Sequence, residues 1–119
     1  MPENLAQKKC VPCEGGTPPL REEEARQHLK NLPDWSLTAD KKSIQAQYEM
    51  KNFVAAVELI RQIAEVAEAE NHHPDIHLTG YRKLRVDLST HAAGGLTEND
   101  FILAAKISRL PKDLRTVKK

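Results

Sequence analysis

The chain lacks several features that would assign it to a specialised class of protein. Aromatic residues make up only 4% of its 119 residues, and 18 basic residues nearly balance 17 acidic ones, leaving a net charge of +1. A module that binds nucleic acid directly usually carries a strong basic excess, so this balance argues against that role. No apolar run approaches the roughly 20 residues that span a bilayer, and the first residues lack the apolar stretch of a signal peptide. We therefore expect one cytoplasmic domain with no membrane contact.

Cysteine is scarce and confined to the N-terminal region, where Cys10 and Cys13 form the motif Cys-Val-Pro-Cys. A C-x-x-C pair serves redox chemistry or supplies half of a zinc site. The glycines and prolines that follow predict a loop, whereas a redox pair needs a helix that lowers the pKa of its thiol. No second C-x-x-C pair completes a zinc site. We expect free thiols in an extended N-terminal arm, residues 1–19, and the redox and metal alternatives stay open.

Hydrophobic periodicity predicts seven elements within residues 20–112, followed by a basic C-terminal tail at residues 113–119. Helical spacing predicts helices at residues 21–31, 53–70 and 101–109, the last preceded by capping-box spacing from Thr97 to Asp100. Period-two alternation predicts strands at residues 35–37, 43–50, 76–78 and 84–88. The alternation leaves one polar face, which is typical of antiparallel sheets. The predicted fold class is α+β: one four-stranded antiparallel sheet with three helices packed on one face, in the order α-β-β-α-β-β-α.

Three of the five histidines gather in one stretch: His72 and His73 are adjacent, and His91 follows the last predicted strand. Imidazole can both give and take a proton near neutral pH, because its ordinary pKa is about 6.5. Carboxylates stand at orienting positions, Glu68 one helical turn before His72 and Asp100 downstream of His91. Plainer interpretations stay open, since Asp100 also fits a helix cap and Glu68 a solvated helix residue.

Alternatives to acid–base chemistry have less support in the sequence. Adjacent residues in extended backbone point in opposite directions, so His72 and His73 chelate one metal ion poorly. The sequence has no H-E-x-x-H motif, which would place two ligands one turn apart on a helix. Ser89 lies near His91 without the signature of a nucleophile elbow. We expect His28 and His77 to be solvated or packing residues. The cluster therefore favours general acid–base catalysis without a bound metal.

Three segments resemble the pterin-4a-carbinolamine dehydratase family. They are Glu68-Ala-Glu-Asn-His-His-Pro-Asp75, Leu88-Ser-Thr-His91 and Gly94-Gly-Leu-Thr-Glu-Asn-Asp100. Leu32-Pro-Asp-Trp35 is also similar to the first helix-to-strand junction of the family. The resemblance covers roughly residues 17–110 and rests on a specific combination of segments.

The resemblance implies a hydro-lyase that converts 4a-hydroxytetrahydropterin to quinonoid dihydropterin and water, in support of tetrahydrobiopterin recycling. It implies neither a metal nor an organic cofactor. It implies a catalytic set of His72, His73 and His91, with His72 and His91 transferring protons and His73 holding the pterin. It also implies a homodimer or homotetramer. Members of the family also act without catalysis, as dimerisation cofactors of a transcription factor or as enzyme-assembly factors, so this alternative and a protein partner stay open. The positions implied to bind or orient the substrate are Glu68, Pro74, Thr90 and Asp100.

Overall fold

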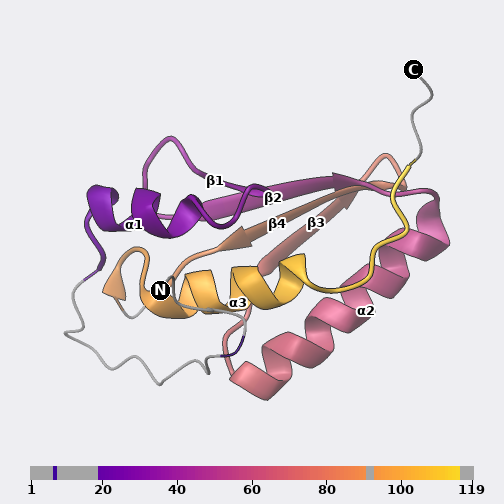
Figure 1. Cartoon of the computed structure of the whole chain (residues 1–119). Coiled ribbons are helices and arrows are strands. Elements are labelled where there is room, and N and C mark those ends of the chain that lie inside the picture. Colours follow the sequence, from indigo (N-terminus) through magenta and orange to yellow (C-terminus); the bar gives the residue numbers. More distant parts are fainter. Residues whose placement is uncertain (1–6, 8–18, 91–92, 116–119) are drawn as a thin grey trace.

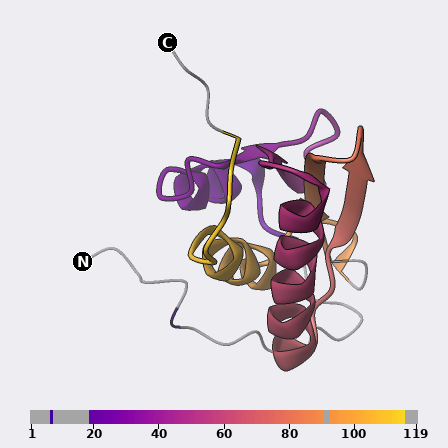
Figure 2. The same cartoon turned by 90° about the vertical axis from the view of Figure 1, so that its right-hand side faces the viewer.

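The computed structural model describes residues 7, 19–90 and 93–115 and arranges them as one antiparallel sheet with three helices on a single face (Figures 1 and 2). The predicted fold class and element order are confirmed. The predicted arm with Cys10 and Cys13 lies outside the described residues, except for residues 7 and 19. The elements are α1 (Glu22–Leu29), β1 (Trp35–Leu37), β2 (Ile44–Glu49), α2 (Phe53–Glu70), β3 (Asp75–Thr79), β4 (Lys83–Leu88) and α3 (Glu98–Ser108).

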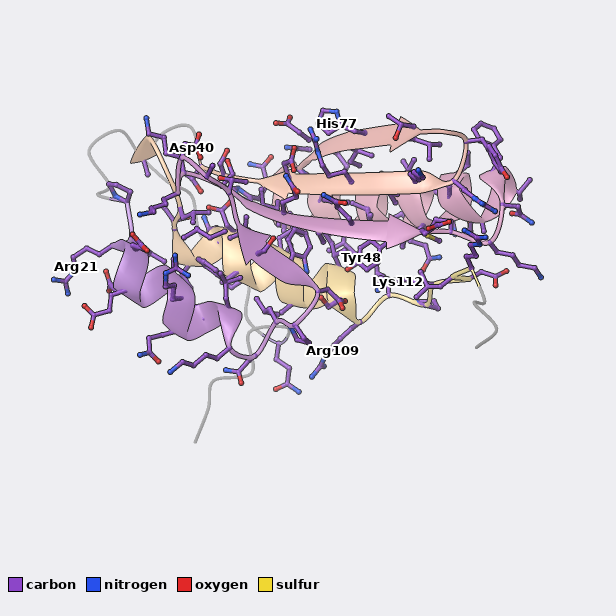
Figure 3. All side chains as sticks on the ribbon, turned by 90° about the horizontal axis from the view of Figure 1, so that it is seen from above. Arg21, Asp40, Tyr48, His77, Arg109 and Lys112 are labelled. Carbon is purple, nitrogen blue, oxygen red and sulfur yellow. The ribbon has the colours of Figure 1, made fainter. Side chains whose placement is uncertain are left out.

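The sheet has the strand order β1-β2-β4-β3, and every neighbouring pair is antiparallel. Strands β2 and β3 both run antiparallel to β4, so they are parallel to each other, and α2 makes the crossover between them. Alternate residues of β2 and β4 are buried against the helices, and the residues between them form the polar face in view in Figure 3. The register sets this division, because it pairs Ile44 with Leu88 and Val86 with Ile76.

Helix α3 is the centre of the core. It lies beneath the sheet with α1 and α2 on its two sides (Figure 2), and almost all of its residues are buried. A helix with this pattern needs apolar contacts all round its circumference. One such contact comes from α1, where the ring of His28 stacks on Phe101 with centroids 4.8 Å apart. His28 therefore has a packing role.

The segment after α3 returns to the sheet and is held there. The Lys112 ammonium donates hydrogen bonds to the carbonyls of Ile107, Ser108 and Leu110 at 2.8, 3.0 and 2.8 Å. It also lies 5.2 Å from the centre of the Tyr48 ring, and Figure 3 shows the two side chains together. Backbone hydrogen bonds then join residues 113–115 to the end of β2, so this part of the predicted C-terminal tail is tied to the domain. Among the described residues, no helix is both long and apolar enough to cross a membrane.

Candidate functional site

The site begins where α2 ends. Asn71 adopts the left-handed conformation, with φ 52° and ψ 41°. Its N–H donates to the carbonyl of Glu68 at 3.3 Å, and the N–H of His72 donates to the carbonyl of Ala67 at 3.2 Å. These two bonds form a Schellman motif, a common way for a helix to satisfy its last carbonyls. The motif reverses the chain, so His72 leaves the helix on the side that faces α3.

The buried carboxylate of Asp100 lies opposite His72, at the N-terminal end of α3. One oxygen, Oδ1, lies 2.6 Å from His72 Nε2. The other, Oδ2, accepts hydrogen bonds from the Thr90 hydroxyl and from the Thr97 backbone N–H, both at 2.9 Å. The Asp100 side chain is 0% exposed and that of His72 is 13% exposed. The pair is therefore largely shielded from water. The Asp100 carboxylate accepts or shares three hydrogen bonds in this site.

The second histidine of the pair lies at the surface. Its Nε2 atom is hydrogen-bonded to Oε2 of Glu68. The side chains of His73 and Glu68 are 56% and 75% exposed, so this contact is solvated. An exposed polar contact of this type contributes little to stability and forms and breaks readily. The two adjacent histidines therefore stand in opposite environments, as the alternation of extended backbone predicts.

The histidine that Glu68 contacts differs from the one expected from the sequence. The expectation that Glu68 orients His72 is wrong, because α2 ends at Glu70 and His72 no longer lies one helical turn above Glu68. Asp100 contacts His72, and the expected contact with His91 falls on a residue outside the described ones. The interpretation of Asp100 as a helix cap is confirmed, because it completes the capping box with Thr97, and the same side chain also contacts His72.

Two threonines and a proline complete the surroundings. The Thr90 backbone pairs with Gly95, with its N–H donating to the Gly95 carbonyl at 2.8 Å. The Thr90 hydroxyl contacts both Asp100 and Thr97. Its Oγ1 atom lies 2.8 Å from Oγ1 of Thr97. The sequence predicted Thr97 only as a helix cap, and its place in the site follows from the buried contact with Thr90. Pro74 is half-buried directly before β3, where it favours extended backbone at His73.

The remaining acidic and histidine side chains do not build a second centre in the described part of the chain. Within residues 7, 19–90 and 93–115, no group of three or more His, Cys, Asp or Glu residues is arranged to hold a metal ion. His77 lies on the polar face of the sheet (Figure 3), where its Nε2 is 3.3 Å from Asp87 Oδ2. His77 is therefore a solvated residue, separate from the cluster around Asp100.

The described site of this α+β domain is thus a histidine held on a buried carboxylate, beside a second histidine at the surface. Comparison with known proteins identifies the family. The sequence profile described as Pterin 4 alpha carbinolamine dehydratase matches residues 18–110. The chain belongs to this family and is a hydro-lyase.

Individual relatives agree with this assignment. A Halorhodospira halophila protein, provisionally named a pterin-4-alpha-carbinolamine dehydratase, is 47% identical over 107 residues, 90% of this chain and 97% of that protein. The Arabidopsis thaliana protein named pterin-4-alpha-carbinolamine dehydratase 2, mitochondrial, is 40% identical over 98% of this chain and 64% of its own length. A Brucella melitensis structure described as a transcriptional coactivator/pterin dehydratase is 31% identical, with a TM-score of 0.71, over 76% of this chain and 95% of that chain.

Proposed function

We propose that this protein dehydrates 4a-hydroxytetrahydropterin to quinonoid dihydropterin by histidine acid–base catalysis, in support of tetrahydrobiopterin recycling. Family membership supports the substrate class. The observation that carries the mechanism is the buried hydrogen bond of 2.6 Å between His72 and Asp100. A carboxylate that fixes an imidazole ring is the arrangement that general acid–base catalysis requires.

The reaction moves two protons. The bond between C4a and its hydroxyl oxygen breaks, and the oxygen needs a proton to leave as water. The N5–H proton is removed, and the electron pair left on nitrogen forms the double bond between N5 and C4a. We assign these two transfers to His72 and to His91, which directly follows Thr90 in the chain. One positioned acid–base group contributes about 10²–10⁴ in rate, which corresponds to about 3–5 kcal/mol of barrier.

The exposed histidine has a different role in this proposal. His73 contacts the pterin ring, and Glu68 holds it by a solvated hydrogen bond. Such a contact can exchange for a contact with the substrate at small energetic cost. Pro74 sets the backbone direction at His73, and Thr90 and Asp100 orient His72.

A stopped-flow assay tests the proposal. The carbinolamine is generated in situ, and its decay is followed by ultraviolet absorbance with and without the protein. The wild-type protein should accelerate the decay, and His72→Ala should lose about 10²–10⁴ of that acceleration. The matched control is His77→Ala, which removes a partly exposed histidine from the opposite face of the sheet and should keep full activity. Folded wild-type protein without acceleration would refute the proposed activity, and equal activity in both variants would refute the role of His72.

A second candidate function is a non-catalytic role as an assembly or interaction protein. The observation that favours it is the description of the Brucella melitensis relative as a transcriptional coactivator as well as a dehydratase. In that role the chain acts as a dimerisation cofactor or as an assembly factor for a protein partner. Histidine variants would then lose no function in a binding assay.

We also propose that the protein is a cytoplasmic homodimer or homotetramer. The resemblance to the family supports this assembly. Light scattering after size-exclusion chromatography tests it, and a mass equal to one 13.4 kDa chain would refute it.

A further inference from the structure

We infer that His72 reacts through Nδ1, and that Thr90 and Thr97 are positioning residues that fix this choice of nitrogen. The inference rests on the proposed function and assigns the reacting atom within it. It starts from the hydrogen bonds around Asp100, which join described residues that are all buried except His72, whose side chain is 13% exposed.

The direction of each hydrogen bond on Oδ2 of Asp100 follows from whether its partner can donate or accept a proton. The Thr97 backbone N–H can only donate, so Oδ2 must accept there. The Thr90 hydroxyl has a single proton, which it donates to Oδ2 at 2.9 Å. The Thr97 hydroxyl is therefore the donor in its 2.8 Å contact with Thr90 Oγ1. The two hydroxyls form a hydrogen-bonded chain in which Thr97 donates to Thr90 and Thr90 donates to the carboxylate.

The same logic fixes the ring of His72. With Oδ2 accepting two hydrogen bonds, Oδ1 is left to accept from Nε2 at 2.6 Å. The reverse arrangement would place a nitrogen lone pair against a carboxylate oxygen in a site where the His72 side chain is only 13% exposed. A neutral imidazole carries a single N–H, so a proton on Nε2 leaves Nδ1 as the basic nitrogen. Nδ1 is therefore the atom through which His72 takes a proton from the substrate, and the resulting imidazolium stays paired with Asp100.

The adjacent histidine supplies an internal comparison. His73 meets Glu68 at the surface, where water can replace either partner. Nothing comparable to the threonine chain restricts Glu68 in the described part of the molecule. We therefore expect His73 to sample both neutral tautomers, whereas His72 adopts one.

Long-range ¹H–¹⁵N correlation spectra of the full chain at mildly alkaline pH test the inference directly, since they distinguish protonated from bare ring nitrogens. His72 should carry its proton on Nε2, and His73 should give averaged signals. In Asp100→Asn, the amide carbonyl should take the place of Oδ2, because the donors from Thr90 and Thr97 remain. The NH₂ group would then face Nε2 and switch His72 to the Nδ1–H tautomer. A wrong tautomer behind the base lowers turnover by about 10⁴ in the serine-protease triad, and a loss of about 10²–10⁴ is expected here.

The threonines are tested by a conservative pair. Thr90→Val removes the hydroxyl donor and should give His72 mixed tautomers and slower turnover, whereas Thr90→Ser should restore a single Nε2–H tautomer and the turnover. A wild-type His72 protonated on Nδ1 would overturn the inference whatever the activity. Equal spectra and turnover for the valine and serine variants would overturn the role of Thr90. The spectra could also show the expected tautomer of His72 while the protein fails to dehydrate the carbinolamine. This result would overturn the proposed function, and it would also overturn the role of Nδ1 as the reacting nitrogen.

Discussion

Replacing Asp100 with alanine removes a fully buried carboxylate that accepts three hydrogen bonds. The Thr97 N–H loses its acceptor in a buried position, which costs about 1–3 kcal/mol. A negative charge at the N-terminal end of α3 also disappears, which costs about 0.3–1 kcal/mol. The Thr90 hydroxyl can rotate and His72 can change its tautomer, so these two donors add little. We expect the free energy of unfolding to fall by about 1–4 kcal/mol.

Glu68→Ala is the matched comparison, because it removes the other carboxylate that holds a histidine. The Glu68–His73 pair is solvated on both sides, and exposed pairs are worth about 0–1 kcal/mol. Alanine also has the higher helix propensity within α2, which offsets part of that loss. We expect the free energy of unfolding to change by less than about 1 kcal/mol.

Urea unfolding at one fixed protein concentration measures both variants, since self-association would make stability depend on concentration. With an m-value of roughly 1.5 kcal/mol/M, the midpoint of Asp100→Ala should fall by roughly 1–3 M of urea, and that of Glu68→Ala by well under 1 M. Equal midpoints for the two variants would show that the burial of Asp100 does not stabilise the fold, and would refute the reasoning about its hydrogen bonds.

Three further predictions concern residues outside the cluster. Lys112→Met should lower the free energy of unfolding, measured in urea, by about 1–3 kcal/mol, because the ammonium donates to three carbonyls at the end of α3. Lys30→Met, at an exposed position, is the control. An equal effect of both substitutions would refute this role of Lys112. Burial, and secondly the charge of Asp34, raise the pKa of Tyr48, so its contribution to stability is complete below pH about 10 and is lost above it. Tyr48→Phe should therefore weaken the fall in thermal stability above pH about 10, and Tyr81→Phe, with an exposed ring, should not. Gly94→Ala should destabilise by about 1–2 kcal/mol, because Gly94 has a φ of 72°, and an unchanged urea midpoint would contradict this.

The fold could be predicted because its signals are local. Asn52 caps α2 by accepting from the Ala55 N–H at 2.8 Å, and the predicted helix over residues 53–70 matches α2 at both ends. Period-two alternation in β2 and β4 reflects burial of one face, which each strand carries in its own sequence. The predicted capping box from Thr97 to Asp100 is confirmed, and α3 begins at Glu98, directly after its N-cap Thr97.

The partners of the histidines could not be predicted in the same way. Pairing Glu68 with His72 assumes that the helix continues for another turn, but the left-handed Asn71 ends it first. Asparagine before the histidine pair is a signal for such an ending, and it could have moved the expectation from His72 to His73. The contact of Asp100 with His72 joins α3 to the segment that follows α2, which is distant in sequence, so it depends on tertiary packing. Periodicity within one helix carries no information on that contact.

The two adjacent histidines are useful to an acid–base enzyme because they stand in opposite environments. The ring of His72 lies against a buried carboxylate and that of His73 faces water, so one peptide segment supplies both a rigid and an adaptable group. The rigid group, His72, is fixed by a carboxylate that two threonine residues hold in turn. The adaptable group, His73, exchanges a solvated contact for one with the substrate at little cost. A proton-transfer atom needs a fixed position, since small displacements reduce the rate strongly, whereas a group that admits substrate and releases product needs freedom to move.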